Sequence, residues 1–386
     1  MKALAVVLVF VALAAAALLL LYELQLEEHY ESTPSPAPPP SPKPRAPSPS
    51  PKPKVKPPKP TGSRREEKRG CLVYVSIVMH SEDAYHRLYP DFRVNRTAYI
   101  IYRRALVEFA EMLHSHGLSF DFQTDWNFLE GVRKWETSEL MESTGGKNVI
   151  RYLQEDLGVS IDPHSHENEG YNYADVAYLI ELLGARPSPV VGGHIFNESS
   201  PLYQNWPRFQ EPIRGSKYPE ASWRAEILWG ESNPGHRGDP VVSGVWRPKV
   251  GDFFTHDEGQ RLVTVGKYTG NLQGVLELVA KIERGELPAG RIYTATVFLE
   301  HCTLTKPGFT EGFERTVVSK LLALQAQGKI CVVTLPEVVE AWLTRYGGQP
   351  NIYLEKPPGQ PTPVIQLPAE RPRELQLPSC SSNIGG

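Results

Sequence analysis

The chain has 386 residues, enough for one large domain or two smaller ones, and carries a formal net charge of -3. This charge is too small to indicate a nucleic-acid partner or any other strongly charged one. The four cysteines are too few for a disulfide framework, and none of their spacings is that of a zinc ribbon. Cys71 and Cys331 could be neighbours in a closed barrel, but we expect them to be two ordinary buried thiols.

The N-terminus predicts a membrane anchor. Lys2 is followed by apolar residues from Ala3 to Leu21 and then by Glu23. An apolar run of about 20 residues can span a bilayer, and the single flanking lysine favours a cytoplasmic N-terminus. The alternative is a cleaved signal peptide, whose apolar region is shorter and is followed by small residues. We expect an uncleaved signal-anchor at residues 1–22, which makes this a single-pass protein of the cell membrane with an extracytoplasmic globular domain.

Residues 23–70 read as an extended linker. The segment from Thr33 to Pro60 is rich in proline, serine, lysine and arginine and contains no acidic residue. Such a segment adopts polyproline II, and at about 3.1 Å per residue it could hold a domain about 80–90 Å from the membrane. A second proline-rich stretch predicts a flexible tail over residues 349–386. The globular domain is therefore expected over residues 71–348.

Strand and helix patterns alternate through this domain. A continuous apolar run at Leu72–Met79 predicts a strand buried on both faces, and helical spacing of apolar residues predicts a helix over Thr97–His116. Further strands are expected at Leu118–Gln123, Val159–Ile161, Pro189–Phe196, Ala225–Trp229, Ser243–Arg247, Leu262–Lys267, Ile292–Glu300 and Ile330–Thr334. Further helices are expected at Lys147–Leu157, Ala174–Leu183, Asn271–Arg284, Thr316–Gln327 and Pro336–Arg345. Such alternation is typical of an α/β fold with a mostly parallel sheet.

Ionisable residues recur where the predicted strands end. Asp162, His164 and His166 follow the third strand, and their period of two would place them on one face. The others follow the first, fourth, middle and penultimate strands: His80, Glu82, Asp83, His194, Arg247, Glu300 and His301. In parallel α/β folds and barrels, active sites lie at the carboxyl ends of strands. We therefore expect these groups to share one site.

A carboxylate and two imidazoles form a suitable ligand set for Zn²⁺, with Fe²⁺, Co²⁺ and Ni²⁺ as alternatives. Such a metal lowers the pKa of bound water to about 7 and polarises a carbonyl oxygen. A second carboxylate can accept a proton from the water, and a histidine on the opposite wall can protonate the leaving group.

In its order of elements the chain resembles the polysaccharide deacetylases (the NodB-homology group, carbohydrate esterase family 4). The resemblance covers about Cys71–Tyr346. It rests on the acidic pair Glu82-Asp83, on His164-Ser165-His166, on Trp246-Arg247-Pro248 and on the strand that delivers His301. It implies a distorted (β/α) barrel of about seven strands.

The resemblance also implies roles for these residues. Carried over, Glu82 would be the general base and His301 the general acid, with Arg247 orienting the base. Asp83, His164 and His166 would be the metal ligands. The family's two metal histidines are four residues apart, whereas Asn168 follows His164 at that spacing, so Asp162, His80 and Glu167 are alternative ligands.

The sequence thus predicts a metal-dependent hydrolase that removes acetyl or similar acyl groups from a cell-envelope carbohydrate. Two alternatives remain open at this point. One is a catalytically inactive barrel that binds carbohydrate, and the other is a metal hydrolase that acts on a small-molecule amide.

Overall fold

The computed structural model describes residues 71–82, 90–200, 202–232 and 238–357. The expected anchor at residues 1–22, the linker at residues 23–70, Asp83 and the tail from residue 358 lie outside these ranges. Within the described ranges, no helix combines the length and the apolar character needed to cross a bilayer.

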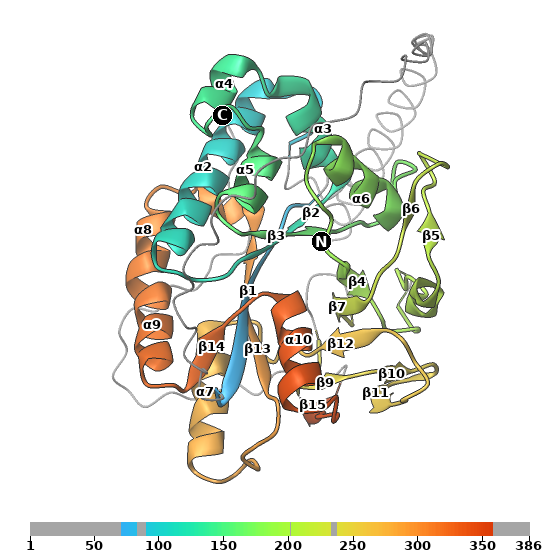
Figure 1. The fold of residues 1–386 in the computed structure, drawn as a ribbon, viewed down its shortest axis with the longest axis vertical. Helices are drawn as coiled ribbons and strands as arrows, with labels where there is room; N and C mark the ends of the chain where they lie inside the picture. The colour runs from blue at the N-terminus through green and yellow to red at the C-terminus, as the bar shows by residue number, and fades with distance from the viewer. Residues whose placement is uncertain (1–70, 83–89, 201, 233–237, 358–386) are drawn as a thin grey trace, which may run out of the picture. The chain divides into compact units, whose positions relative to one another are not determined.

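The strand β1 (Val73–His80) organises the fold, and all its residues are buried. It pairs in parallel with β2 (Asp121–Thr124), β13 (Thr294–Glu300) and β14 (Ile330–Val332). The sheet continues from β2 to β3 (Ser160–Pro163), again in parallel. These parallel strands, interleaved with helices, confirm the predicted α/β fold (Figure 1).

A second sheet of four strands lies next to the first along the ring. Its order is β4 (Val190–Ile195), β7 (Ile227–Glu231), β12 (Val263–Val265) and β9 (Val245–Trp246). One parallel bridge between His164 and Gly192 links it to β3. On its other side, the amides of Thr296 and Phe298 in β13 donate to the carbonyls of Lys267 and Gly270, just past β12. The strands therefore lie in a distorted ring that is weakly joined at two places.

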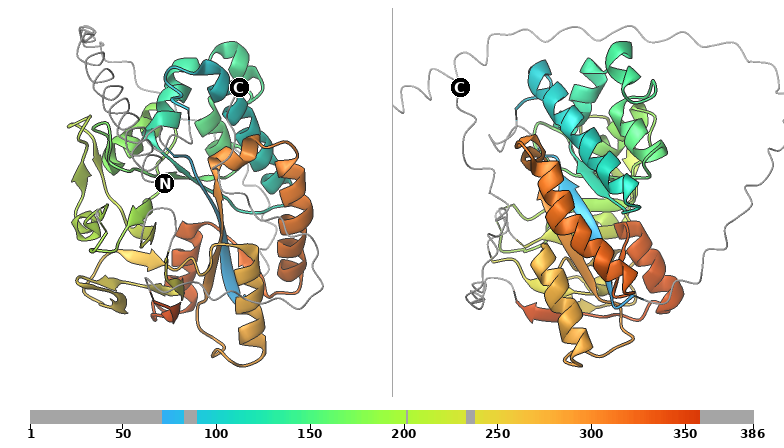
Figure 2. Two further views of the ribbon diagram at one scale, coloured as in Figure 1. Left: turned by 180° about the vertical axis from the view of Figure 1, so that it is seen from behind. Right: turned by 90° about the vertical axis from the view of Figure 1, so that its left-hand side faces the viewer.

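Alternate residues of β1 face opposite sides of this ring. Val73, Val75, Ile77 and Met79 belong to the large core shared with the helices, whereas Tyr74 and Val78 pack with the opposite strands β7, β9 and β12. The helices α2 (Arg96–Ser115), α7 (Leu272–Glu283) and α9 (Ser319–Ala326) cover the outer face of β1 and β13 (Figure 2). His80 follows the even-numbered pattern and so faces the interior.

The remaining helices include three that match predicted helices within a few residues and several that were not predicted. The three are α5 (Val149–Glu155), α6 (Tyr173–Leu182) and α10 (Leu335–Arg345). Among the others, α3 (Trp126–Trp135) begins directly after its N-cap Asp125. The other short helical segments are α4 (Ser138–Glu142), α8 (Phe309–Phe313) and the 3₁₀ segments η2 (Trp206–Gln210) and η4 (His301–Thr305). The π-helical η5 (Glu314–Val318) runs into α9, and the two together correspond to the helix predicted over Thr316–Gln327.

In the described part of the chain, three small pairs of antiparallel strands are separate from the two larger sheets. They are β5 (Ile213–Arg214) with β6 (Ser222–Trp223), β10 (Pro248–Lys249) with β11 (Asp252–His256), and β8 (Val241–Ser243) with β15 (Tyr353–Lys356). β15 lies beyond residue 348, where the sequence pattern placed the end of the domain. Its Glu355 carboxylate accepts hydrogen bonds from Tyr268 and Lys281, which tie the strand to the barrel.

One prediction about the cysteines was wrong. Cys71 and Cys331 form a disulfide rather than two thiols, with their Cα atoms 5.7 Å apart. The parallel pairing of β1 with β14 brings the residues together, since Val73 is the partner of Ile330 and Tyr74 that of Cys331. The two cysteines are 260 residues apart in sequence, so only the sheet topology brings them into contact.

Candidate active site

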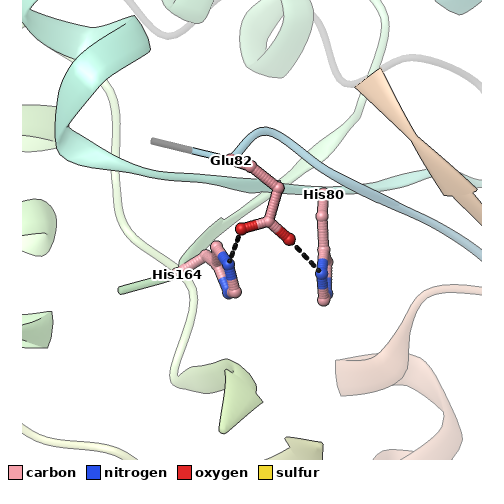
Figure 3. A group of neighbouring side chains, drawn as sticks. All are labelled: His80, Glu82 and His164. Carbon is pink, nitrogen blue, oxygen red and sulfur yellow. Dashed lines mark hydrogen bonds and ion pairs between the residues drawn. The ribbon is translucent and has the colours of Figure 1, made fainter. Parts of the chain in front are cut away.

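The Glu82 carboxylate lies between two imidazoles at the carboxyl end of β1 (Figure 3). Its Oε1 is 3.3 Å from Nδ1 of His80, and its Oε2 is 3.2 Å from Nε2 of His164. One ligand atom from each of these three residues lies within 4.8 Å of the other two. Parallel pairing across β1, β2 and β3 produces this convergence, because it brings the carboxyl ends of β1 and β3 to one edge.

His166 also contacts the Glu82 carboxylate, at the oxygen that faces His164. Its Nε2 is 2.5 Å from Oε2 of Glu82, and its ring lies edge-on to that of His164 with the centroids 4.9 Å apart. The side chain of His166 is 21% exposed, against 1% for His164 and 4% for His80. Among these three histidines, His166 is therefore the most exposed to solvent.

Hydrogen bonds determine which nitrogen of each buried imidazole carries the proton. Nδ1 of His164 is 2.8 Å from the carbonyl oxygen of Gly192, which can only accept, so Nδ1 carries a proton. Nε2 of His80 is 2.7 Å from Oε1 of Gln123, whose amide nitrogen donates to Asp162. Nε2 of His80 is therefore the protonated nitrogen. In their neutral forms both rings point a lone pair at Glu82.

This donor set fits a divalent cation. A carboxylate and two imidazole lone pairs are all acceptors, and they repel one another unless a positive charge lies among them. That charge can be a proton on an imidazole or a metal ion held by all three groups. Nitrogen and carboxylate ligands together suit Zn²⁺ and the neighbouring transition metals. The second nitrogen of each ring is engaged by an outer hydrogen-bond partner, as is usual for metal-binding histidines.

The electrostatics of Glu82 favour its ionised form. Burial alone would raise the pKa of this carboxyl group. The positive charges of His166 and His164 in their protonated forms, and the hydrogen bonds that the protonated rings donate, hold the pKa well below its ordinary value. Glu82 is therefore a carboxylate at neutral pH, as a metal ligand must be.

Glycine makes room for the two stacked rings. The rings of His80 and His164 stack with centroids 4.4 Å apart, and they lie directly over Gly193. A Cβ atom at Gly193 would come within 2.6 Å of both rings, and the residue has a φ of +64° that side-chain-bearing residues rarely adopt. The edges of Trp229 and Phe298 enclose His80 on other sides.

The loop that carries His166 is strongly restrained. Glu167 and Glu169 both have positive φ, at 58° and 49°, which is costly for residues other than glycine. Three separate segments of the chain supply the contacts that hold this conformation. Asn168 accepts from the Trp126 indole at 2.9 Å, Glu169 pairs with Arg93 at 2.9 Å, and Glu167 pairs with Arg208.

An aromatic stack reinforces the same loop. Trp126 and Tyr171 are nearly parallel, with an angle of 8° and centroids 4.9 Å apart. The Arg93 guanidinium lies over the outer face of Trp126 at 4.7 Å, and the Lys217 ammonium lies 5.0 Å from the Tyr171 ring centroid. The stack packs Tyr171, at the end of the loop, against Trp126 in α3, and the two cation–π contacts stabilise the stacked rings.

The alternative ligands named from the sequence occupy different positions. His80 lies in the cluster itself. Asp162 lies beneath it, where Ser160 and Ser188 donate to one carboxylate oxygen and Gln123 donates to the other. Burial raises the pKa of Asp162 to about 6, although these three hydrogen bonds oppose the shift. Glu167 is engaged by Arg208, and Asp83 lies outside the described residues.

The two other predicted catalytic residues, Arg247 and His301, both contact aromatic rings. The Arg247 guanidinium carbon lies 5.5 Å from the ring centroid of Trp342 in α10. His301 is fully buried in a cage that includes Tyr102 and Phe128, with its Nδ1 3.2 Å from Oγ of Ser81. Burial lowers the pKa of His301 to about 3, so its ring is neutral at physiological pH.

Gln123 is a site residue that the sequence patterns did not indicate. It lies in β2 and faces the barrel interior next to His80, its direct neighbour in the β1–β2 register. The signal for it was available in part, since it ends a predicted strand on a face shared with Asp121. A lone glutamine carries no recognisable motif, however, and only the pairing register places it beside a histidine.

No protein-family model and no curated protein matches this chain. Solved structures do resemble it. An allantoinase is 10% identical with a TM-score of 0.42, covering 71% of this chain and 91% of its own. A 4-alpha-glucanotransferase from Thermococcus litoralis is 12% identical with a TM-score of 0.41, covering 76% and 43%. A family 4 carbohydrate esterase from Bacillus anthracis is 9% identical with a TM-score of 0.26, covering 70% and 86%.

The similar structures thus include the family that the sequence motifs resemble. Their TM-scores are below 0.5 and their identities are close to 10%. Fold alone does not determine function in any case, since it is the site that carries the chemistry.

Proposed function

We propose that this protein is a metal-dependent hydrolase that removes acetyl or similar acyl groups from a cell-envelope carbohydrate. One observation carries the proposal: His80, Glu82 and His164 converge at the carboxyl ends of β1 and β3, with their ligand atoms within 4.8 Å of one another. The resemblance of the sequence motifs to polysaccharide deacetylases supports the choice of substrate and reaction. Zn²⁺ is the first candidate metal, and Fe²⁺, Co²⁺ and Ni²⁺ are alternatives.

In this proposal His80, Glu82 and His164 hold the metal. When bound, a divalent cation supplies a Lewis acid that polarises the acyl carbonyl and lowers the pKa of a water molecule. The protein residues orient these partners, and the buried rings and Trp229 keep bulk water from the inner side of the site. Asp83, which the motif also implies as a ligand, remains a candidate ligand. Glu82, which the motif implies as the general base, is a ligand in this proposal.

We assign proton transfer to His166. Its Nε2 can hold a proton, because it lies 2.5 Å from the Glu82 carboxylate, and its partial exposure gives it access to a substrate. A general acid or base must be within hydrogen-bond reach of the group that it serves and must change protonation state near the working pH. A neutral histidine enclosed by aromatic rings meets neither condition well, so His301 as the general acid and Arg247 as the residue that orients the base stay predictions from the motif alone.

We also propose that the domain works outside the cytoplasm, as the expected signal-anchor implies. The disulfide between Cys71 and Cys331 supports this location, because disulfides form and persist in oxidising compartments. The expected anchor and proline-rich linker would hold the domain near a cell-envelope glycan.

The proposal is tested by two measurements on the purified full chain. Metal content is measured by mass spectrometry and Zn²⁺ affinity by competition with a chromogenic chelator, in the wild type and in His164→Gln. Acetate release is then measured from acetylated glycan oligomers and from small acetamides. His116→Gln is the matched control, because His116 pairs with Glu314 on the surface.

We expect the wild type and His116→Gln to bind a stoichiometric amount of metal and His164→Gln to lose metal binding. We expect the wild type to release acetate from the oligomers. Metal binding without any acetate release would favour the carbohydrate-binding barrel. Turnover of the small acetamides but not of the oligomers would favour the small-molecule hydrolase. A wild type with neither bound metal nor measurable Zn²⁺ affinity rules the proposal out.

A further inference from the structure

A row of three side chains crosses the sheet beneath the site. His80 in β1 is the register partner of Gln123 in β2, and Gln123 is the register partner of Asp162 in β3. All three residues are almost completely buried. Because neighbours in register on one face of a sheet lie about 5 Å apart, their polar ends meet inside the barrel.

The hydrogen bonds along this row have only one consistent direction. The Asp162 carboxylate accepts from Oγ of Ser160 at 2.7 Å and Oγ of Ser188 at 2.5 Å through Oδ1, and from the Gln123 amide nitrogen at 3.2 Å through Oδ2. A carboxylate can only accept, so it turns the NH₂ group of Gln123 toward itself. The carbonyl oxygen of Gln123 must then face His80, 2.7 Å from Nε2.

We infer that Asp162, acting through Gln123, selects the tautomer of His80 that leaves the Nδ1 lone pair facing Glu82. Asp162 is then a positioning residue, although the sequence alone offered it as an alternative metal ligand. This inference rests on the proposed function for its purpose, since a lone pair at Nδ1 is what a metal held with Glu82 and His164 requires. The tautomer itself is a property of the protein without metal.

The chain contains an internal comparison for this effect. The partner of Nδ1 of His164 is the backbone carbonyl of Gly192 at 2.8 Å, an acceptor that no side-chain substitution removes. The tautomer of His164 is therefore set by the backbone, whereas that of His80 is set by two side chains. A substitution in the row should move the proton on His80 and leave the proton on His164 in place.

Asp162→Asn reverses the direction of the hydrogen bonds along the row, although asparagine has almost the same shape as aspartate. The carbonyl oxygen of the new side-chain amide would take the position that receives both serine hydroxyls, so its NH₂ group would face Gln123. Two NH₂ groups cannot share a hydrogen bond, so the Gln123 amide must turn over and present its own NH₂ group to His80. Nε2 of His80 then has to accept, and its proton moves to Nδ1, where Glu82 receives it.

Gln123→Met should also move the proton of His80 from Nε2 to Nδ1. It removes the acceptor from Nε2 of His80, while the Glu82 carboxylate remains as a strong acceptor at Nδ1, 3.3 Å away. Gln154→Met is the matched control, because Gln154 bonds the backbone of Arg186 at the surface. Urea unfolding of each variant establishes that the domain is folded.

The experiment is ¹⁵N NMR of the metal-free full chain labelled with [¹⁵N]histidine. It is recorded about two pH units above the usual histidine pKa of about 6.5, so that the rings are neutral. Loss of signals in His80→Gln and His164→Gln assigns the two rings. Zn²⁺ affinity of every variant is measured in parallel by chelator competition.

We expect an unprotonated Nδ1 on His80 in the wild type and in Gln154→Met, and a protonated Nδ1 in Asp162→Asn and Gln123→Met. His164 keeps a protonated Nδ1 throughout. The affinity for Zn²⁺ should fall about 10- to 100-fold in the two row variants, the usual effect of removing an outer partner of a metal-binding histidine. If either folded variant keeps the wild-type tautomer of His80, the inference is wrong. If the wild type binds no Zn²⁺, the proposed function fails while the tautomer result still decides the inference.

Discussion

Nε2 of His166 lies 2.5 Å from Oε2 of Glu82, on the carboxylate oxygen that also faces His164. The sequence motif suggests equivalent roles for His164 and His166 as metal ligands, but their surroundings differ. His164 is buried and its Nδ1 is fixed by a backbone carbonyl, whereas His166 is partly exposed on a strained loop. These surroundings favour metal binding by His164 and proton transfer by His166.

The first prediction concerns these histidines individually. We expect His80→Gln and His164→Gln to lower Zn²⁺ affinity at least ~100-fold, because each removes one of three ligand atoms. His166→Gln should change Zn²⁺ affinity less than about 10-fold but slow turnover about 10²- to 10⁴-fold, the usual contribution of general acid–base catalysis. Chelator competition and acetate release measure the two effects. Equal loss of metal in all three variants would instead make His166 a ligand.

The second prediction concerns the loop that carries His166. Trp126→Phe keeps an aromatic ring against Tyr171 but removes the indole hydrogen bond to Asn168. A net hydrogen bond contributes about 1 kcal/mol, so we expect a small loss of stability, a roughly 3- to 10-fold lower kcat/KM and unchanged Zn²⁺ affinity.

Trp135→Phe is the matched control for this variant. The Trp135 indole donates to the carbonyl of Phe92 at 2.6 Å, so the substitution also removes one indole hydrogen bond but none to the loop. Equal losses of kcat/KM in both variants would show a general effect on stability rather than on the position of His166.

The third prediction concerns His301 and pH. Its pKa is lowered to about 3 in the folded protein, against about 6.5 in an unfolded chain. Below about pH 6.5 the unfolded state binds a proton that the folded state does not. The stability contributed by neutral His301 is therefore complete above about pH 6.5 and is lost as the pH falls toward about 3, by up to about 1.4 kcal/mol per pH unit.

Urea unfolding at about pH 4.5 and about pH 7.5 measures this effect, because the two values lie on either side of the unfolded-state pKa. We expect His301→Gln to lose less stability than the wild type between the two values, with His116→Gln behaving like the wild type. The same variant tests the role implied by the motif. Turnover slowed about 10²- to 10⁴-fold with intact metal binding would support His301 as the general acid, whereas we expect it to slow less than about 10-fold.

The fourth prediction concerns the disulfide. Cys71 and Cys331 link the start of β1 to β14 across a separation of 260 residues. Because a disulfide that closes a long loop restricts the unfolded chain, replacing both residues with serine should lower the free energy of unfolding by about 2–5 kcal/mol. A lower urea midpoint with a similar dependence on urea concentration would show this. An unchanged midpoint would mean that pairing of β1 with β14 is sufficient without the bond.

Much of the fold was predictable because its strands are locally distinctive. The run at Leu72–Met79 corresponds to β1, and the helical spacing over Thr97–His116 corresponds to α2, each within one residue or so at either end. α3 was missed because it is ten residues long and follows β2 with only Asp125 between them. The short strands of the middle region depend on pairing with distant segments, which local patterns do not report.

The location of the site could be predicted from the sequence, but the arrangement of its side chains could not. Period-two alternation and the carboxyl ends of strands indicated that Glu82, His164 and His166 would gather, and the structure brings all three together. His80 was only an alternative ligand at the level of sequence, because the resemblance implied Asp83, His164 and His166 as the ligands. Its place in the cluster follows from the direction in which β1 ends.

The amino-acid sequence by itself determined which residues form buried strands, which face of each strand is polar at its end, and which chemical groups are available there. Only the tertiary structure decided that His80, Gln123 and Asp162 stand in one row, because that depends on the register between strands. A shift of one residue would turn every side chain to the opposite face, and no local pattern within a strand records how it aligns with its neighbour. For the same reason the contact between Cys71 and Cys331 was set by the pairing of β1 with β14.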